Sequence, residues 1–573
     1  MDKQQNVVGS AAYEEADGVL QEYLKSADYN DVTAVLDAEI GEYYGDRERV
    51  WNAVRKGLLF NCRNYELYNM LGNYYLSENL CQAYLCYENA LFYCDNEEDR
   101  KPLTQMLYQL KEEQSVAVNR VSIVILSCNS LEYTKLCIDS IRRTTPESVR
   151  EIVIVDNASK DGSAEWLREQ TDIILIENEE NNGFPAGCNQ GIRASSPGTD
   201  IFLLNSDTIL PLNALFWLRM GLYENEKNGM AGSTSNYARG QVAQGAESTD
   251  DLFKFAEEIN VPMKYPYEDR LFLVGFALLI KRAVVDEIGL LDERFSPGNY
   301  EDNDYGLRVF MAGYRNVLCK NSFILHFGNV SFKNNSMDLK GISSENCQKL
   351  NEKWGFNVAY YTYPRWELIQ LIDEAMDAKL HVLDVGCGCG ALMGGVKGIY
   401  PKAEVYGIEL VSKVAEIASR MGKVVCGNVE KLELPWEKEY FDYIIMGDIL
   451  EHLMKPEKVL MKLGKYLKKG GYIIVSIPNV KHYSVLIPLL RQDIFSYKDA
   501  GILDRTHVKL YTGTEIQRLI VQCGYEIETI DAIGEELPGE EEEAFIDRLC
   551  SLMEIPDKLS FLAYQYILKA VKH

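Results

Sequence analysis

The sequence predicts a multidomain α/β protein in which an α-helical region precedes two α/β domains. Through residues 1–118, apolar residues recur at spacings of three and four, which is typical of amphipathic helices. From Val121 onwards short β-branched runs alternate with helical patterns, and a second such series begins at HVLDVGCG (381–388). This alternation predicts parallel sheets covered on both faces. A length of 573 residues suits three to four domains of about 150 residues each.

Composition and charge exclude several classes of protein. Lys and Arg number 59 against 86 Asp and Glu, a formal net charge of −27, and so acidic a surface repels nucleic acid and anionic lipid. With 47% hydrophobic residues the chain can bury several cores, which excludes global disorder. The start MDKQQNVVGS lacks the features of a secretory signal, and the longest apolar runs fall short of the roughly 20 residues of a spanning helix. We therefore expect a cytoplasmic protein, not an integral membrane protein, whose 14 cysteines are reduced thiols.

The helical region contains one more specific pattern. Its residues are Tyr68, Leu71, Gly72, Tyr75, Ala83, Tyr87 and Ala90. This pattern resembles the two-helix tetratricopeptide repeat with one residue deleted between the helices. Small residues at Gly72 and Ala83 would let the two helices approach, and a generic helical bundle stays open as the alternative. In either case residues 1–118 form a candidate docking module for a protein partner.

In the first α/β domain, polar groups follow the predicted strands. VSIVILSCNS (121–130) supplies Ser127 and Asn129, and EIVIVDNAS (151–159) supplies Asp156 and Asn157. Ligands bind at the carboxyl ends of strands in open α/β sheets, so a carboxylate such as Asp156 suits the base or ribose of a nucleotide. Two later motifs complete the set: NNGFPAGCNQGI (181–192), with Gly183 and Asn189, and LLNSDT (203–208), with Asn205 and Asp207.

This ordered set resembles the family 2 glycosyltransferases of the GT-A fold, in their rhamnosyltransferase-like branch, over a domain at residues 119–357. The resemblance implies a nucleoside-diphosphate sugar donor and a Mg²⁺ or Mn²⁺ ion against its diphosphate. The usual Asp-x-Asp motif has Asn205 at its first position here, so Asp207 becomes the expected direct ligand and Asn205 is expected to reach the ribose or a metal-bound water. His326, in FILHFG, matches the histidine that often completes the metal shell.

The acidic cluster in NYEDNDYGLR (299–308) matches the family's catalytic base position at Asp302, with Glu301 and Asp304 beside it. An inverting transfer needs a carboxylate that takes the proton of the acceptor hydroxyl as its oxygen attacks the anomeric carbon. Clustered acids raise one another's pKa, which favours a base in this group.

The second α/β domain, at residues 363–573, resembles class I S-adenosylmethionine-dependent methyltransferases. HVLDVGCGCGALMG carries Asp384, Gly386, Gly388 and Gly390, and EVYGIEL ends its strand on Glu409. The resemblance implies that the glycines admit the methionine moiety of the cofactor, that Glu409 holds the ribose hydroxyls, that Asn428 and Val429 lie at the adenine, and that Asp448 lies near cofactor and substrate.

Candidate acceptor-side residues lie beyond the fifth strand of this domain. His482 and His507 are two of the six histidines of the chain, and either is a candidate base for methylation of a hydroxyl. The same segment resembles methyltransferases found beside or fused to bacterial glycosyltransferases.

Together these features predict a bifunctional enzyme of bacterial surface-glycan or glycoprotein-glycan assembly. The first domain would transfer a sugar with inversion to a glycan or glycoprotein acceptor, and rhamnose is suggested by branch resemblance alone. The second would methylate a sugar hydroxyl of the same glycan. Two alternatives stay open: a methyltransferase whose GT-A domain only binds glycans, and a tetratricopeptide-based scaffold for other glycan-assembly enzymes.

Overall fold

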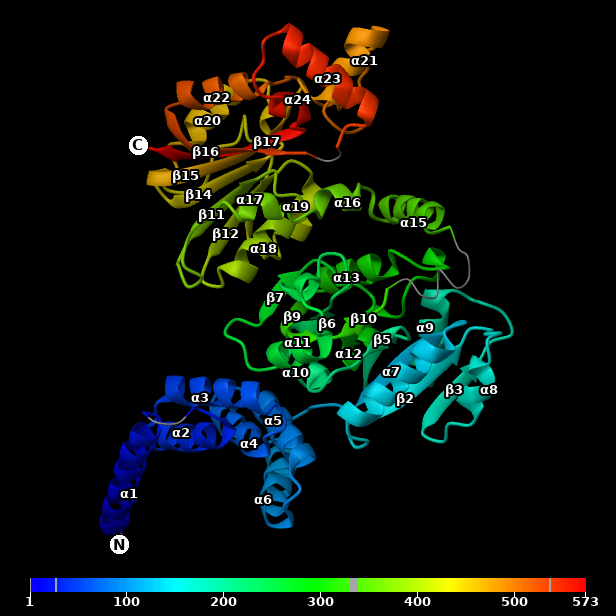
Figure 1. Cartoon of the computed structure of the whole chain (residues 1–573), viewed down its shortest axis with the longest axis vertical. Coiled ribbons are helices and arrows are strands. Elements are labelled where there is room, and N and C mark those ends of the chain that lie inside the picture. The colour runs from blue at the N-terminus through cyan, green and yellow to red at the C-terminus, as the bar shows by residue number, and fades with distance from the viewer. Residues whose placement is uncertain (1, 26–27, 329–337, 535–536) are drawn as a thin grey trace. The chain divides into compact units, whose positions relative to one another are not determined.

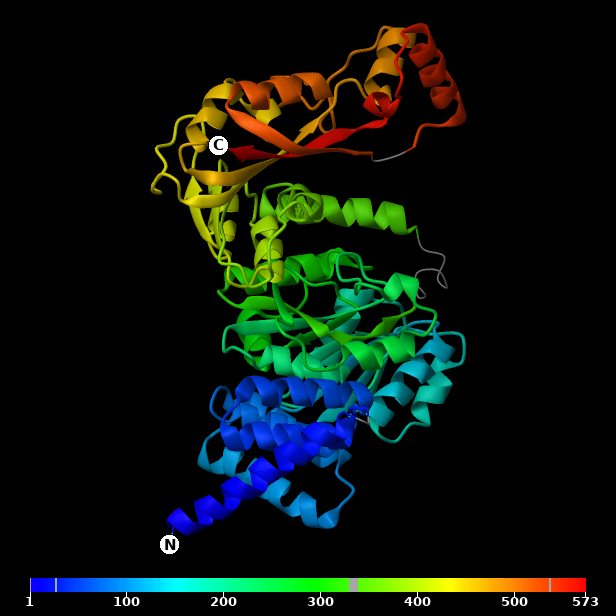
Figure 2. The same ribbon diagram turned by 60° about the vertical axis from the view of Figure 1, so that its left-hand side comes forward.

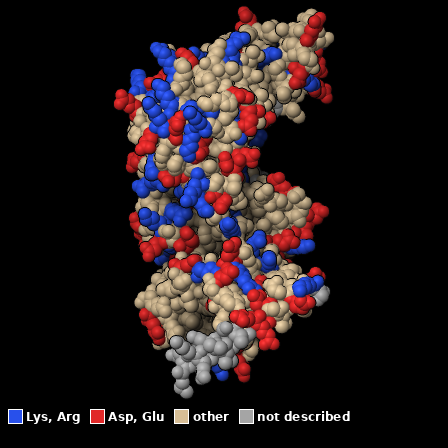
Figure 3. All heavy atoms as spheres, turned by 90° about the vertical axis from the view of Figure 1, so that its left-hand side faces the viewer, with Lys and Arg blue, Asp and Glu red and all other residues tan. Residues whose placement is uncertain are grey.

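The computed structural model describes residues 2–25, 28–328, 338–534 and 537–573. The chain divides into two compact units, Met1–Gly355 and Phe356–His573, whose elements can be followed in two views (Figures 1 and 2). No helix of the described ranges combines the length and apolarity that crossing a bilayer requires. Basic and acidic side chains are intermixed on the face drawn in Figure 3, so the acidic residues there lie on solvated surface.

The first unit begins with helices, as the spacing of apolar residues predicts. These are α1 (Asp2–Tyr23), α2 (Asp31–Tyr44), α3 (Arg47–Phe60), α4 (Tyr65–Tyr75), α5 (Leu80–Tyr93), α6 (Glu97–Tyr108) and the π-helical turn η1 (Gln109–Glu113). Each helix from α2 to α6 starts at an Asn or Asp whose side chain accepts a backbone N–H of the first turn, the usual N-cap arrangement. No strand occurs among residues 2–25 and 28–118.

Helices α4 and α5 pack closely at the small residues of the tetratricopeptide-like pattern. A Cβ atom at Gly72 would lie 2.6 Å from the ring of Tyr87, and Ala83 is fully buried. The close approach therefore follows the spacing seen in the sequence, while membership of the repeat family stays a prediction.

The helical region shares a core with the α/β part of the first unit. The ring of Tyr68 on α4 meets Phe216 edge-on, with centroids 5.4 Å apart, and Nε2 of Gln82 donates to the carbonyl of Met220 at 3.0 Å. Arg219, 3% exposed, forms an ion pair with Glu88. The helices are thus built into the first unit and are not a freely tethered module.

The remaining elements of the first unit alternate in type. They are β1 (Val121–Ser127), α7 (Leu131–Thr144), β2 (Arg150–Asp156), α8 (Ser163–Arg168), β3 (Ile173–Glu177), α9 (Phe184–Ala194), β4 (Asp200–Asn205), β5 (Thr208–Ile209), α10 (Ala214–Leu222), β6 (Asn228–Thr234), η2 (Ala246–Ser248), α11 (Leu252–Ile259), β7 (Tyr267–Arg270), β8 (Ala277–Ile280), α12 (Arg282–Ile288), η3 (Glu293–Phe295), α13 (Glu301–Met311), β9 (Arg315–Phe323), β10 (Leu325–His326) and α15 (Leu339–Trp354).

The large sheet has the strand order β3-β2-β1-β4-β8-β6-β9-β7. Strands β1 to β4 pair in parallel, and both faces are covered, since Ile123 and Ile125 belong to one core cluster and Val124 to another. The four strands predicted to be parallel are so, and beyond them the sheet is mixed, because β8 runs antiparallel to both of its neighbours, β4 and β6. A strand buried on both faces is a continuous apolar run in either direction, so the pattern LFLVGFALLI carries no information on orientation.

The second unit forms a seven-stranded sheet in the order β13-β12-β11-β14-β15-β17-β16, with β17 antiparallel to its neighbours. Its elements are α16 (Val358–Tyr361), α17 (Trp366–Ile369), β11 (His381–Val385), α18 (Ala391–Ile399), β12 (Glu404–Glu409), α19 (Ser412–Ala418), β13 (Lys423–Cys426), β14 (Phe441–Gly447), η4 (Leu450–His452), α20 (Pro456–Leu463), β15 (Leu467–Pro478), α21 (Tyr483–Gln492), α22 (Gly513–Gln522), β16 (Tyr525–Ile533), α23 (Glu540–Leu552), α24 (Leu559–Leu562) and β17 (Gln565–Lys572). The series of strands that the sequence predicts from HVLDVGCG onwards is confirmed. The last two strands of the chain, β16 and β17, complete the sheet.

Candidate active sites

The predicted donor residues of the first unit follow three adjacent parallel strands. Ser127 and Asp156 are partners at the ends of β1 and β2, and Asn205 pairs with Leu126 at the end of β4. Parallel strands present their carboxyl ends at one edge of a sheet. The structure therefore brings the sequence motifs together at that edge.

Asp156, one of the predicted donor residues, has a carboxylate oxygen that is available to bind a ligand. Its carboxylate is 2% exposed; Oδ2 accepts the backbone N–H of Ser159 at 3.0 Å, whereas Oδ1 has no hydrogen-bond partner in the described ranges. A buried acceptor without a partner is unfavourable, so an N–H or hydroxyl of a ligand suits Oδ1. Asn157 shapes the neighbouring loop, because its amide oxygen accepts the backbone N–H of Asn182 at 3.2 Å.

Other predicted donor residues are occupied by contacts within the protein. Asn189 donates to the carbonyl of Leu291 and accepts its N–H at 3.0 Å, and the Ser127 hydroxyl lies 3.1 Å from that of Thr134. Asn129 accepts the N–H of Lys160 at 2.7 Å. These side chains join loops and helices around the site, and their assignment as donor contacts stays a prediction.

Gly183 is required by close packing. It has φ +82°, and a Cβ atom there would lie 2.9 Å from Cα of Pro297. The glycine thus lets the loop before α9 pass against residues 296–297, and any contribution to donor binding is through the backbone.

The metal-ligand candidates of the first unit meet at the short β5–β10 pair. Nδ1 of His326 lies 2.7 Å from the carbonyl oxygen of Tyr237, so Nδ1 carries the proton and Nε2 presents its lone pair. Nε2 lies 3.3 Å from Oδ1 of Asp207 and 3.5 Å from Nδ2 of Asn205. Oδ1 of Asn205 is buried without a hydrogen-bond partner in the residues described. An imidazole nitrogen and a carboxylate oxygen therefore face each other beside the Asn205 amide, and this pair of ligand types fits a divalent cation.

The acidic cluster begins helix α13. The Asp302 carboxylate accepts backbone N–H groups of Gly275 and Asn303, both at 2.8 Å, and burial raises its pKa. Glu301 is buried beside it, and within the described part of the chain its Oε2 has no hydrogen-bond partner. Burial followed by the charge of Asp302 raises the pKa of Glu301 well above the usual range. A cavity lined by Asn299, Tyr300 and residues of α15 adjoins the start of the helix.

Two residues missed in the sequence connect this cluster to the metal-ligand candidates. Gly275 binds Asp302, and the next residue, Phe276, stacks on His326 with ring centroids 5.2 Å apart. The carbonyl of Phe276 also accepts the N–H of Asn205 at 2.9 Å. Only a three-dimensional structure can find this link, because Gly275 and Phe276 lie within an ordinary apolar run.

Asp304 is separate from the candidate base. It is fully buried and forms ion pairs with Arg308 at 2.9 Å and Lys353 at 2.7 Å, and the indole of Trp354 donates to it at 3.1 Å. The catalytic assignment of Asp304 is therefore corrected: the residue ties α13 to α15, because Asp302 and Asp304 point to different sides of the helix.

In the second unit, the glycine-rich turn after β11 is held by a hydrogen bond to Glu409. Gly386, Gly388 and Gly390 all have positive φ, and a Cβ atom at Gly388 would lie 2.6 Å from the carbonyl oxygen of Tyr361. The Glu409 carboxylate accepts the N–H groups of Gly388 at 3.0 Å and Val411 at 2.8 Å. Burial raises the pKa of Glu409, and burial followed by the charge of Glu409 raises the pKa of Asp384 to about 7.

Asp448 is the centre of a polar network. Its carboxylate accepts Nη1 of Arg365 at 2.7 Å and the hydroxyl of Ser476 at 2.7 Å, and Nε2 of Gln565 lies 3.1 Å away. Asp448 also has φ +54°. Sequence reasoning missed Arg365, Ser476 and Gln565, which lie on separate segments.

The two predicted adenine contacts, Asn428 and Val429, lie in different surroundings. Asn428 accepts the N–H of Glu430 at 2.8 Å and forms a turn after β13, so its position at the sheet edge agrees with the prediction. Val429 is 7% exposed and belongs to the apolar core, and its carbonyl accepts Nζ of Lys462 at 2.9 Å. The Val429 side chain is therefore part of the core, which corrects the prediction of a cofactor contact for it.

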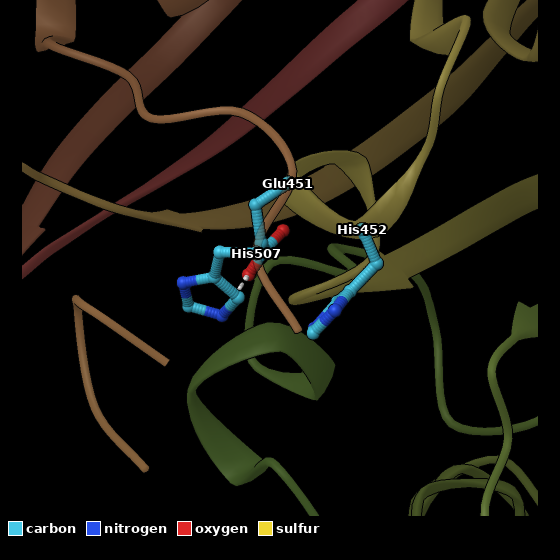
Figure 4. A group of neighbouring side chains, drawn as sticks. All are labelled: Glu451, His452 and His507. Carbon is cyan, nitrogen blue, oxygen red and sulfur yellow. Dashed lines mark ion pairs between the residues drawn. The ribbon is translucent and has the colours of Figure 1, made fainter. Parts of the chain in front are cut away.

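The two histidines predicted as acceptor-side bases differ in their surroundings. His482 caps α21 with Nδ1, and burial lowers its pKa to about 4, which makes it a weak base. His507 lies in the group Glu451, His452 and His507 (Figure 4), where its Nε2 lies 3.9 Å from Oε1 of Glu451. His507 therefore lies among other ligand-type side chains, whereas His482 serves as a helix cap, and the acceptor-side role of either residue stays a prediction.

The fold and these sites define a protein with two α/β transferase domains. One has an imidazole and a carboxylate facing each other at the β5–β10 pair and an acidic cluster at the start of α13, and the other has a glycine turn whose backbone donates to Glu409. The family model described as Glycosyl transferase family 2 matches residues 122–289, and the model described as Methyltransferase domain matches residues 362–530. The chain therefore carries a family 2 glycosyltransferase domain followed by a methyltransferase domain, the fold class that supports S-adenosylmethionine as a cofactor.

Curated relatives match each domain. Glycosyltransferase AglE of Haloferax volcanii is 27% identical over 34% of this chain and 62% of its own length. Malonyl-[acyl-carrier protein] O-methyltransferase of Halalkalibacterium halodurans is 28% identical over 31% of this chain and 65% of its own length. A solved structure of GalNAc-T7 with UDP, GalNAc and Mn²⁺ matches at 14% identity over 36% of this chain and 44% of that chain, with a TM-score of 0.30. The chain spans 35% to 66% of the length of the first curated relatives.

Proposed function

We propose that the chain is a bifunctional enzyme that transfers a sugar from a nucleoside diphosphate to an acceptor hydroxyl with inversion and methylates a sugar hydroxyl of the same glycan. The observation that carries the first activity is the link from Asp302 through Gly275 and Phe276 to His326. It couples a carboxylate base to the cation ligands. The second activity is supported by the glycine turn held by Glu409.

A Mg²⁺ or Mn²⁺ ion would be held by Asp207 and His326, and the Asn205 side chain lies beside them. Bound there, the ion would neutralise the charge that develops on the departing diphosphate. The residues fit this ion because Nδ1 of His326 is engaged by Tyr237, which directs Nε2 toward Asp207.

The side chains divide the remaining work of sugar transfer. Asp156 would bind the base or ribose through its free Oδ1. Asp302 would take the proton of the acceptor hydroxyl, and the two backbone N–H groups that it accepts orient its carboxylate. Burial and the charge of Asp302 raise the pKa of Glu301 well above its usual range, which favours Asp302 over Glu301 as the base.

In the methyltransferase domain, Glu409 would bind the ribose hydroxyls of S-adenosylmethionine beside the glycine turn. Methyl transfer is an in-line displacement, so the enzyme mainly positions donor and acceptor. The group around His507 lies next to the Asp448 network, since the charges of Asp448 and Arg365 act on Glu451. This group would therefore face the acceptor.

The finer assignments form part of the same proposal. Rhamnose as the sugar and a role in surface glycans or glycoproteins are supported by motif resemblance alone. A cytoplasmic location is part of the same proposal, since a chain whose cysteines form no disulfide among the described residues suits a reducing compartment. A partner of the helical region would bind its outer surface, because the inner surface is packed against α10.

A donor screen tests the proposal. The full chain is incubated with a panel of nucleotide sugars and Mn²⁺, and free sugar release and S-adenosylmethionine binding are measured. We expect hydrolysis of one donor that requires Mn²⁺ and is lost in Asp302→Asn, with cofactor binding unchanged. Donor binding without turnover at any metal concentration would instead favour a glycan-binding GT-A domain, and full turnover by Asp302→Asn would place the base elsewhere.

A further inference from the structure

The group Glu451, His452 and His507 has the composition of a metal site that the proposed chemistry does not use. One ligand atom from each residue lies within 4.8 Å of the others, and Figure 4 shows the three side chains converging from two segments. Glu451 and His452 lie on η4, directly after β14, whereas His507 lies in the loop before α22. The backbone joins these segments, since the carbonyl of Glu451 accepts the N–H groups of Val508 at 2.9 Å and Lys509 at 3.1 Å.

Both histidines are oriented as metal ligands usually are. Nδ1 of His507 lies 2.9 Å from the carbonyl oxygen of Ile502, and Nδ1 of His452 lies 3.2 Å from that of Thr506. A ring nitrogen beside a carbonyl oxygen carries the proton, so Nε2 of each ring keeps its lone pair. A backbone carbonyl that fixes the tautomer in this way is a common outer contact of metal-bound histidine.

Glu451 supplies an independent observation. The residue is 1% exposed, and neither carboxylate oxygen has a hydrogen-bond partner among the described residues. Its contact with Nε2 of His507, at 3.9 Å, is longer than a hydrogen bond. A buried carboxylate without a partner is strongly unfavourable, and a cation between it and the two imidazoles would remove that cost.

We propose that Glu451, His452 and His507 bind one divalent transition-metal ion on the acceptor side of the methyltransferase domain. Two imidazoles and one carboxylate suit Zn²⁺, Fe²⁺ or Mn²⁺ better than Mg²⁺ or Ca²⁺, which prefer oxygen ligands. Three protein ligands leave coordination positions open, and neighbouring hydroxyls of a sugar can fill them. This inference rests on the proposed methylation of a sugar hydroxyl.

The ion would lower the pKa of the acceptor hydroxyl. The hydroxyl oxygen attacks the methyl carbon of S-adenosylmethionine, the carbon–sulfur bond breaks, S-adenosylhomocysteine leaves and the hydroxyl proton passes to solvent. His507 is then a metal ligand and not the base that the sequence predicts.

Metal binding is tested in an untagged full-length chain that carries Asp207→Asn and His326→Ala, which removes the cation ligands of the first unit. Zn²⁺ and Mn²⁺ binding is measured by equilibrium dialysis and elemental analysis. We expect about one ion per chain, and at least a tenfold loss of affinity in Glu451→Gln and in His507→Asn. His381→Asn is the matched control, because His381 also lies 3.9 Å from a glutamate, Glu404, but on a more exposed strand.

The outcomes separate this inference from the proposed function. Equal metal affinity in Glu451→Gln, His507→Asn and the parent would overturn the site. The thermal shift produced by S-adenosylmethionine shows whether each variant retains a folded cofactor site. If the chain binds neither S-adenosylmethionine nor an acceptor, the methyltransferase proposal fails whatever the metal result. If methyl transfer continues at the same rate after chelation, the catalytic part of the metal proposal is wrong.

Discussion

Nε2 of His326 lies 3.3 Å from Oδ1 of Asp207, and Nδ1 of the same ring is engaged by the Tyr237 carbonyl. Two electron-pair donors thus face each other at the sheet edge of the glycosyltransferase domain. A cation bound between them would make this contact favourable.

His326→Ala should therefore weaken Mn²⁺-dependent donor binding. Loss of even an outer contact of a metal ligand costs about 10- to 100-fold in affinity, so loss of the ligand should cost at least as much. Titration of donor binding with Mn²⁺ measures the effect. His381→Ala, in the other unit, should leave the titration unchanged, and an unaltered Mn²⁺ requirement in His326→Ala would exclude the residue as a ligand.

Asp302→Asn should lower sugar transfer by about 10²- to 10⁴-fold, the usual contribution of a general base. Because burial raises the pKa of Asp302 and a base acts deprotonated, the wild-type rate should fall as the pH drops through that raised pKa. The pH profile of kcat/KM should lose this acid limb in the variant. Asp286→Asn, an exposed change on α12, should keep both rate and profile.

Gly388→Ala should remove S-adenosylmethionine binding. The residue has φ +53°, and the added Cβ would lie 2.6 Å from the Tyr361 carbonyl oxygen, so the glycine turn must move. Gly470→Ala separates the two causes, since Gly470 also has positive φ, +73°, but nothing within 4 Å of the added atom. Isothermal titration should show a loss only in Gly388→Ala; similar losses in both would point to backbone strain alone.

Asp384→Asn should change how stability depends on pH. Burial raises the pKa of Asp384 from 3.8 to about 7, so between these pH values the folded chain holds a proton that the unfolded chain has released. The contribution of this group to the free energy of unfolding therefore falls as the pH rises from about 4 to about 7. The variant should gain stability relative to wild type over this range, by up to about 4 kcal/mol.

Denaturant unfolding of the second unit at several pH values, followed by tryptophan fluorescence, measures this gain. Asp373→Asn, at an exposed position, should show no pH-dependent difference from wild type. A constant difference between Asp384→Asn and wild type from pH 4 to pH 8 would contradict the prediction.

Tyr68→Ala should destabilise the glycosyltransferase unit although Tyr68 lies in the helical region. The side chain is fully buried and meets Phe216 of α10, and loss of a large buried aromatic costs about 3–5 kcal/mol. Calorimetry should show a lower melting temperature for the first unit and an unchanged melting temperature for the second. Tyr108→Ala, at a 63% exposed residue, should melt as wild type does, and independent melting of the helical region in Tyr68→Ala would argue against a shared core.

Both α/β domains and most of their strands could be predicted from the sequence, because alternating apolar runs report local burial. The orientation of β8, which is antiparallel to β4 and β6, could not be predicted, because an apolar run buried on both faces has the same pattern in either direction. In the helical region, too, local pattern predicts the elements but not their tertiary contacts. Its helices follow from the spacing of apolar residues, but the burial of Arg219 against Glu88 depends on a partner 131 positions away.

The sequence by itself determined which chemical groups follow each strand, because a motif such as LLNSDT or HVLDVGCG is local and its strand ends at a predictable point. Only the tertiary structure decided which of those groups retain free atoms. Packing occupies Asn189 and Asp304 with contacts inside the protein, yet leaves Oδ1 of Asp156 without a hydrogen-bond partner among the residues that the structure describes. The fold also joined Glu451 to His507, because their proximity depends on how two distant segments pack.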